Sequence, residues 1–248
     1  RKGGLSEDRI TGNMVWGEFT HLTARPVKGH PDPHLHAHCF VFNATHDPVE
    51  DIWKAGQFGD LKRDAPYYEA IFHSELAKSV KELGYGILRT TKGWEVNGIP
   101  HSLIKEFSQR TELIEEAARK KGATSDKEKD ALGAKSREKK NLELSADELK
   151  NKWLERAGDE GAKQIERIVR EKPRQPTQKV SEKEALDAAI HHSFERESVV
   201  DERRLYARAL RRGYGDVDLS GMRVEYATRE LISNEERNRT SVTTKEVL

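Results

Sequence analysis

The sequence has little cysteine, no long apolar run and no excess of charge of one sign. Its single cysteine, Cys39, excludes an internal disulfide and a cysteine-based zinc knuckle, and is typical of a cytoplasmic protein. No apolar run approaches the ~20 residues of a membrane-spanning helix, so we expect no membrane span. Lys and Arg number 44 against 43 Asp and Glu, so contacts with nucleic acid must come from local basic clusters.

Two segments near the start of the 248-residue chain have the composition of β-strands. Residues 14–23 and 35–43 are rich in β-branched and aromatic side chains, and the second is nearly apolar on both faces, so we expect it to be buried. Residues 24–33 between them contain three prolines and a glycine, which predicts a loop. The two strands are therefore expected to pair as an antiparallel hairpin with a long loop.

Apolar periodicity and capping patterns predict that most of the remaining chain is helical. The expected elements are a helix over residues 64–84, a short hairpin over 85–91 and 94–96, and a helix over 102–121. Ser145 with Glu148 and Ser181 with Glu184 have the spacing of capping boxes, and each pair predicts the start of another helix. After the second box, helices are expected over 182–195, 201–212 and 219–232.

Together these elements predict an α+β fold, in which an antiparallel sheet packs with helices and is followed by further helices. We expect a first domain over residues 1–122, a helical extension over 123–171, a linker over 172–180 and a small helical or winged-helix-like module over 181–248. The chain starts without methionine and its last residues have the pattern of a new element, so we expect a fragment of a longer protein.

Five histidines lie between residues 21 and 38, and three of them have the spacing of a metal site. His36 and His38 are two residues apart on a predicted strand, so their side chains point to the same face. His21 lies late in the preceding strand, and strand pairing would bring it to the other two. Three neutral imidazoles leave coordination positions open for water or a substrate oxygen, as in catalytic rather than structural sites.

The other histidines of this cluster are weaker candidates. His34 is in phase with the predicted pair but lies at the edge of the loop, and His30 lies within the loop, where we expect exposure to solvent. A lone strand histidine is usually structural, but unpaired imidazoles in an apolar strand would be costly, which favours metal binding. The three ligands would accept Mg²⁺, Mn²⁺, Zn²⁺ or Ni²⁺, and the sequence does not choose among them.

The residues around these histidines resemble a known family. The pattern consists of His21 followed by Thr23 and Arg25, a Pro-x-Leu-His-x-His strand from Pro33, and Asn43. In this order the sequence resembles the relaxase–helicase family of conjugative plasmids, the TrwC/TraI type, within the His-hydrophobic-His (HUH) endonucleases. Weaker similarity extends along the rest of the chain, up to the region that joins relaxase to helicase in that family.

The resemblance implies a metal-dependent nickase that acts on single-stranded DNA at a transfer origin during plasmid mobilisation. A divalent metal ion on His21, His36 and His38 would polarise the scissile phosphate, and a tyrosine hydroxyl would attack it. The products would be a 5′-phosphotyrosine and a free 3′-hydroxyl. The implied partners are the conjugation machinery and a helicase domain of the same polypeptide. Arg25 has a family counterpart and is the expected contact to a DNA phosphate, which contributes affinity but no sequence choice.

The nucleophile is the part of the family pattern that this sequence does not match. In the family, the tyrosine and an aspartate that orients a metal-binding histidine lie upstream of the histidine strands, and no tyrosine precedes His21 here. Tyr67 and Tyr68 lie on a predicted helix, where packing against the sheet is the favoured interpretation. We therefore expect the metal site without the family's nucleophile, and the catalytic residue stays unknown.

Other functions stay open at this point. A related rolling-circle replication or transposition nuclease would use a helical tyrosine, and a non-enzymatic DNA-binding relaxase remnant would use none. A metal-dependent oxygenase or cupin also carries His-x-His on a strand, but normally adds a carboxylate soon after, and none follows His38 until Asp47. Arginines crowd the second helix of the module over 181–248 and suit nucleic acid, whereas its acidic residues suit an interdomain adaptor equally well.

Overall fold

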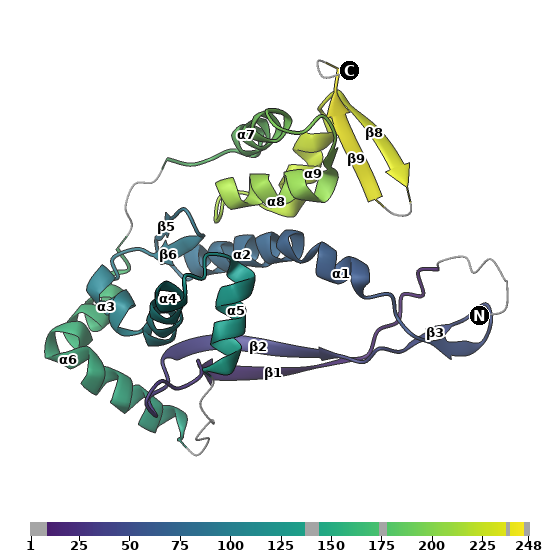
Figure 1. Cartoon of the computed structure of the whole chain (residues 1–248). Helices are drawn as coiled ribbons and strands as arrows, with labels where there is room; N and C mark the ends of the chain where they lie inside the picture. Colours follow the sequence, from purple (N-terminus) through teal and green to yellow (C-terminus); the bar gives the residue numbers. More distant parts are fainter. Residues whose placement is uncertain (1–8, 137–143, 174–177, 237–238, 246–248) are drawn as a thin grey trace. The chain divides into compact units, whose positions relative to one another are not determined.

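The computed structural model of the chain describes residues 9–136, 144–173, 178–236 and 239–245, and it has the expected α+β composition. The chain divides into two compact units, each built from two stretches of sequence. Unit 1 comprises Arg1–Phe58 and Pro100–Ile165, and unit 2 comprises Gly59–Ile99 and Glu166–Leu248. Figure 1 labels the elements of both. Among the described residues, no helix combines the length and the apolarity that crossing a membrane requires.

The described part of unit 1 contains a long two-stranded ribbon, a small hairpin and helices. The ribbon pairs β1 (Trp16–Thr23) with β2 (Pro33–Val41) in antiparallel fashion, close to the two strands expected. The other elements are the hairpin of β3 (Thr45–Asp47) and β4 (Ile52–Lys54), α3 (His101–Glu106), α4 (Gln109–Lys121), α5 (Asp126–Lys135) and α6 (Ala146–Glu171), which belongs to unit 1 as far as Ile165. The single helix expected over 102–121 is therefore two helices.

Local sequence accounts for several of the helix ends in unit 1. Helix α4 ends at Gly122, whose φ of 65° is the left-handed conformation that glycine adopts at helix ends. Helix α5 begins at a capping box in which the side chains of Ser125 and Glu128 each bond the other's backbone N–H group. The expected box of Ser145 and Glu148 is also present, at the start of α6. This prediction is confirmed.

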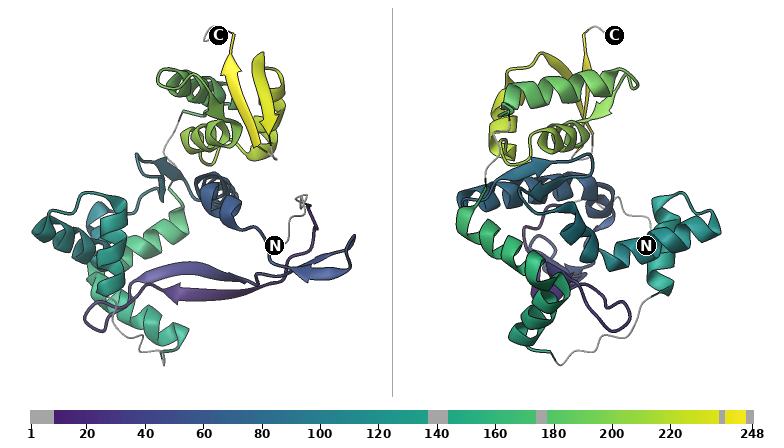
Figure 2. Two further views of the ribbon diagram at one scale, coloured as in Figure 1. Left: turned by 45° about the vertical axis from the view of Figure 1, so that its right-hand side comes forward. Right: turned by 90° about the vertical axis from the view of Figure 1, so that its left-hand side faces the viewer.

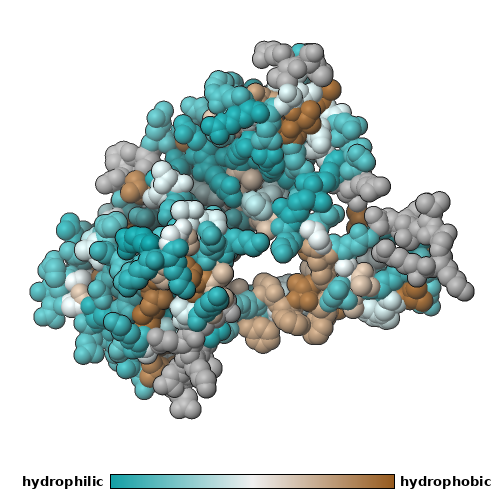
Figure 3. All heavy atoms as spheres, viewed as in Figure 1, coloured by the Kyte–Doolittle hydropathy of each residue, from teal (hydrophilic) through white to brown (hydrophobic). Residues whose placement is uncertain are grey.

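The ribbon is exposed on both faces, which corrects the expectation that its second strand is buried. Most of β2 is exposed, with Leu35 at 73% and Phe40 at 61%, and Phe19 on β1 is 60% exposed. Figure 3 shows brown, apolar spheres along this ribbon. Among the described residues this sheet has two strands, so each strand is paired along one edge only, and most side chains stay in contact with solvent.

Unit 2 combines a long helix with a module that has the element order of a winged helix. Its first part is α1 (Gly59–Arg63), α2 (Ala65–Glu82) and the hairpin of β5 (Ile87–Arg89) and β6 (Trp94–Val96). The module is α7 (Glu182–Phe194), β7 (Val200–Asp201), α8 (Glu202–Arg212), α9 (Leu219–Ala227), β8 (Leu231–Glu236) and β9 (Arg239–Thr244). Its strand order is β7-β9-β8, and both views of Figure 2 show the yellow hairpin beside the module's green helices.

The core of unit 2 lies where α2 packs on the module. Ala70 of α2 is fully buried in one cluster with Leu186 and Met222 of the module. Ser74 of α2 donates a hydrogen bond from its buried Oγ to the carbonyl oxygen of Val217 over 2.6 Å. Because the module buries α2, the units interleave along the chain, whereas the expected parts followed one another in sequence. The expected domain boundaries stay a prediction. Residues 174–177 of the expected linker lie outside the described residues.

The end of the module differs from its prediction. The helix expected over residues 219–232 ends at Ala227, and the following residues form β8 and β9. Val242 of β9 is buried against Val200 and Leu205. Burial of this kind depends on tertiary contacts, which local helical periodicity does not reveal, and it favours the strand here.

Candidate metal centre

Three histidine side chains meet on one face of the β1–β2 ribbon. His21 on β1 lies directly opposite His36 on β2, and His38 follows two residues later on the same strand face. The ring centroids are 5.5 Å apart for His21 and His36 and 4.9 Å apart for each of the other two pairs. The structure therefore brings the three predicted ligands together.

The donor atoms of these imidazoles fit a single divalent ion. One ring nitrogen of each histidine lies within 4.8 Å of the others, and no second group of this kind occurs among the described His, Cys, Asp and Glu residues. Nitrogens bound to one ion at about 2.1 Å are about 3.0–3.4 Å apart, so small side-chain rotations would close the site. His21 and His36 are half-buried and His38 is exposed, so the cluster is accessible from solvent.

A hydrogen bond to the backbone sets the tautomer of one ligand. Nδ1 of His36 lies 2.8 Å from the carbonyl oxygen of His34. Because a carbonyl oxygen can only accept, Nδ1 must carry the proton. The lone pair of neutral His36 is then on Nε2, which is the nitrogen left for a metal ion.

The two competing histidines lie near this cluster but contribute no ring nitrogen to it. The ring of His34 stacks on that of His36 with 4.6 Å between centroids. Burial lowers the pKa of His34, and the nearby His36 lowers it further. His30 is exposed at the turn between the strands, where its backbone bridges to Val27. The structure thus places His30 in the loop as expected, whereas His34 lies within β2 rather than at the edge of the loop.

The loop between the strands contains the expected DNA contact and a residue that sequence analysis missed. Arg25 is half-buried and makes no ion pair with the part of the chain that the structure describes. Asp32 is 5% exposed and its carboxylate accepts hydrogen bonds from Arg156 and from the backbone of Gln109. An aspartate in a proline-containing loop is ordinarily exposed to solvent, so no local signal marked Asp32 as buried.

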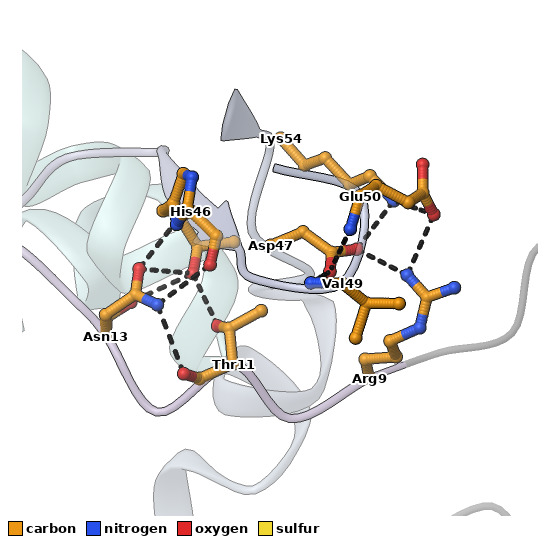
Figure 4. A network of polar contacts seen from close by, with 9 residues as sticks. Arg9, Thr11, Asn13, His46, Asp47, Val49, Glu50 and Lys54 are labelled. Atoms are coloured by element: carbon orange, nitrogen blue, oxygen red, sulfur yellow. Dashed lines mark hydrogen bonds and ion pairs between the residues drawn. The ribbon is translucent and has the colours of Figure 1, made fainter. Parts of the chain in front are cut away.

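Polar contacts hold the other end of the ribbon, as Figure 4 shows. The side chain of Asn13 accepts from the backbone N–H of His46 over 2.7 Å and donates to its carbonyl oxygen over 2.8 Å. Nearby, the 2% exposed Asp47 accepts hydrogen bonds from Lys54 and Arg9. The bond from Lys54 contributes most to lowering the pKa of Asp47 well below its usual range. These contacts join the segment before β1 to the segment after β2.

The two tyrosines considered as nucleophiles lie on α2 in unit 2. Tyr67 is 8% exposed, belongs to the main core cluster of that unit, and has its ring centroid 6.4 Å from that of Tyr206. Tyr68 is 42% exposed. Tyr67 is therefore packed as expected, but its partners are helices of the module, such as α8 with Tyr206, and not the sheet that sequence analysis expected.

Four of the five arginines of α8 form ion pairs with acidic residues of their own unit. Their ion pairs are Arg203 with Asp64, Arg204 with Glu197 at 2.7 Å, Arg208 with Glu197 at 3.6 Å, and Arg211 with Glu69 at 3.4 Å. A guanidinium already paired within the protein is a weaker contact for a phosphate, so crowding of arginine along this helix overstates the charge it presents.

Comparisons with known proteins find one matching family and several similar solved structures. The family described as TrwC relaxase matches residues 1–159. A structure of metal-free conjugative relaxase TrwC in complex with OriT DNA is similar at a TM-score of 0.54 and 30% identity, covering 62% of this chain and 54% of that one. A metal-bound TrwC complex with OriT DNA has a TM-score of 0.54 and 30% identity, covering 62% of this chain and 53% of that one. TrwC complexed with a 27-mer DNA comprising the recognition hairpin and the cleavage site has a TM-score of 0.53 and 30% identity, covering 61% of this chain and 54% of that one.

The chain thus spans about half the length of these solved structures. A search of the curated proteins gives no match.

Proposed function

The chain belongs to the TrwC relaxase family, and from this premise we propose that unit 1 carries the metal centre of a conjugative relaxase. Such an enzyme nicks one strand of DNA at a transfer origin and transfers it. The observation that carries the proposal is the cluster of three imidazoles on one ribbon face, with ring nitrogens within 4.8 Å of one another.

In this proposal His21, His36 and His38 would hold a divalent ion. Three neutral imidazoles add no negative charge, so the ion would supply its full charge to stabilise a scissile phosphate. One similar TrwC structure is described as metal-bound and another as copper-bound. The same donor set suits Mg²⁺, Mn²⁺, Zn²⁺ or Ni²⁺. The chain's own contribution is to hold the three rings on one face, with the proton of His36 on Nδ1.

The proposed substrate is single-stranded DNA at a transfer origin, because the similar TrwC structures contain OriT DNA. Arg25 is the proposed phosphate contact beside the metal centre. It follows His21 by four residues and makes no ion pair within the described chain. A contact of this kind would strengthen binding to any sequence and weaken as salt concentration rises.

We assign no nucleophile to the described residues. Tyr67 is packed in the core of unit 2, and Tyr68 lies beside it on the same helix. The sequence pattern of the family places its tyrosine upstream of the histidine strands. We therefore propose that this chain binds the metal ion and that neither Tyr67 nor Tyr68 acts as the nucleophile.

Metal titration tests the first part of the proposal. Calorimetry with Mn²⁺ and with Zn²⁺ should give one site, and replacing any one of His21, His36 and His38 by alanine should weaken it at least about 10-fold. His73→Ala, in unit 2, is the matched control and should leave the affinity unchanged. Equal affinities for all four variants would contradict the metal centre.

Incubation with single-stranded origin DNA and Mg²⁺ or Mn²⁺ tests the second part. We expect binding without a covalent product. A DNA adduct on Tyr67 or Tyr68, located by mass spectrometry, would contradict the proposal and favour a rolling-circle type of nuclease. DNA binding by a chain that binds no metal ion in the titration would instead favour a DNA-binding relaxase remnant that is not an enzyme.

For the module over 181–248 we propose an adaptor role toward a helicase domain and the conjugation machinery, rather than DNA binding. The ion pairs that engage the arginines of α8 support this choice. The adaptor role predicts that α8 contributes little to the affinity of the chain for DNA. Arg204→Ala, which removes a paired guanidinium, should leave the affinity for single-stranded DNA unchanged.

A further inference from the structure

The ribbon that carries the metal ligands contains a β-bulge beside them. Pairing is regular from Trp16 opposite Val41 to His21 opposite His36, but Thr23 then pairs with Pro33. One residue of β1 therefore lies opposite two of β2, His34 and Leu35. A bulge of this kind leaves a residue unpaired and re-aims the groups around it.

The loop end of the ribbon is fixed by helices of the same unit. The buried carboxylate of Asp32 accepts a hydrogen bond from Nη2 of Arg156 on α6, and another from the backbone N–H of Gln109, the first residue of α4, over 3.0 Å. Trp153 of α6 donates from Nε1 to the carbonyl oxygen of Pro31 over 2.9 Å. We call these contacts of Asp32 and Pro31 the loop anchor.

The charges of the loop anchor are well matched. A carboxylate at the N-terminus of a helix is favoured by the partial positive charge there. The guanidinium of Arg156 is held in turn, since its Nη2 also donates to the carbonyl oxygen of Glu106 over 3.1 Å and it lies 4.3 Å above the ring of Phe107. The guanidinium that binds Asp32 is therefore already held in position by other contacts of Arg156.

The ribbon itself supplies little to keep the bulge in place. Register is strongly specified when one face of a strand is buried, and β2 is mostly exposed on both faces. The contacts of Asn13 hold only the opposite end of the ribbon. The loop anchor is the described contact set that lies next to the bulge, and the backbone of Asp32 also accepts from the N–H of Ala24 over 2.9 Å, which ties both strands to it.

We propose that Asp32 is a positioning residue of the metal centre: by fixing the loop end it holds the bulge in which the His34 carbonyl accepts Nδ1–H of His36, and so keeps Nε2 of His36 free for the ion. This inference rests on the proposed metal site. Asp32 does not touch the ion or the substrate, and acts through the backbone of His34.

The tautomer of His36 in the metal-free chain is the direct readout. Nitrogen-15 NMR of labelled histidine distinguishes protonation at Nδ1 from protonation at Nε2, and assignment by comparison with His36→Ala isolates this ring. The native chain should show the Nδ1-protonated form, and Asp32→Asn should shift the ring toward a mixture of both forms. Asp47→Asn is the matched control, because it removes another buried, charge-paired carboxylate of the same unit, at the far end of the ribbon.

Metal affinity is the second readout. Asp32→Asn should weaken Mn²⁺ or Zn²⁺ binding about 10-fold, which is the smallest loss of affinity usual for residues that orient a metal ligand. Asp47→Asn should leave the affinity unchanged. Trp153→Phe, which deletes only the hydrogen bond to Pro31, should act in the same direction by a smaller factor. Trp153→Phe also tests the loop anchor if Asp32→Asn fails to fold.

Two results would overturn the inference. One is a His36 tautomer and a metal affinity that are unchanged in both Asp32→Asn and Trp153→Phe. The other is an equal effect of Asp47→Asn, which would mean that general loosening of unit 1, and not the loop anchor, is responsible. Failure of the proposed function is distinguishable, because a chain that binds no metal still reports its tautomer.

Discussion

Replacing Asp64 by asparagine should destabilise unit 2 by removing one buried charge that ties three of its elements together. The carboxylate is 5% exposed and lies directly before α2. It accepts hydrogen bonds from Arg203 of α8 and, over 3.1 Å, from Arg239 of β9. Asparagine keeps nearly the same shape but carries no charge, so both guanidinium groups would lose a shared partner.

The expected magnitude follows from the exposure of the partners. Breaking a fully buried ion pair costs about 3–5 kcal/mol. The side chains of Arg203 and Arg239 are 33% and 31% exposed, so water screens them, and Arg239 keeps a second partner, Asp201, at 2.7 Å. We therefore expect the free energy of unfolding of unit 2 to fall by about 1–3 kcal/mol.

Urea unfolding followed by hydrogen exchange of assigned unit 2 amides measures this change, and exchange in unit 1 should be unaffected. Asp60→Asn is the control, because its ion pair with Arg63 lies on the surface and should contribute less than about 0.5 kcal/mol. If Asp64→Asn costs no more than the control, the argument that Asp64 joins α2 to the module is refuted.

Further predictions concern the metal centre, a capping box and a helix end. His36→Ala should abolish one-site metal binding in calorimetry, whereas His30→Ala should preserve it because His30 is exposed and outside the cluster. Hydrogen bonds from Ser181 lower the pKa of Glu184 below its ordinary value of 4.5. The ionised Glu184 therefore stabilises the folded chain above pH 4.5, and this contribution is lost as the pH falls through the lowered pKa. Thermal unfolding of Glu184→Gln should consequently lose less stability on acidification than the native chain. Gly122→Ala should cost about 1 kcal/mol in urea unfolding because φ is 65° there, although no neighbouring atom obstructs the added methyl; no loss would contradict the left-handed helix end.

The meeting of the three histidines could be predicted because its geometry depends on local rules. Two histidines two residues apart on a strand share a face whatever surrounds them, and His21 needed only antiparallel pairing to join them. The capping boxes at Ser145 and Ser181 belong to the same class, since the contact joins residues three apart. Features set by nearest neighbours along the chain or across one hairpin are within reach of sequence reasoning.

Features that depend on distant partners were not within reach. The second strand looked buried because it is apolar, but burial requires a layer to cover it, and the sequence does not say where such a layer lies. The hairpin after Ala227 forms because Val242 is buried against Val200 and Leu205. Likewise, the packing of α2 on the module depends on contacts such as that of Ser74 with Val217, 143 residues away.

The balance of charge shows why pairing must be known before a basic cluster is given a function. With 44 basic and 43 acidic side chains, the chain has enough carboxylates of its own to pair with its arginines. Four of the five arginines of α8 do meet carboxylates, and so does Arg156, whose partner Asp32 lies 124 residues away in the loop between the histidine strands. Arg156 would have been counted as a surface charge on a helix, yet its position makes it part of the support for the proposed metal centre. The proposed site therefore uses charged residues in two ways: the paired Asp32 and Arg156 support it, and Arg25, which makes no ion pair within the described residues, is its proposed phosphate contact.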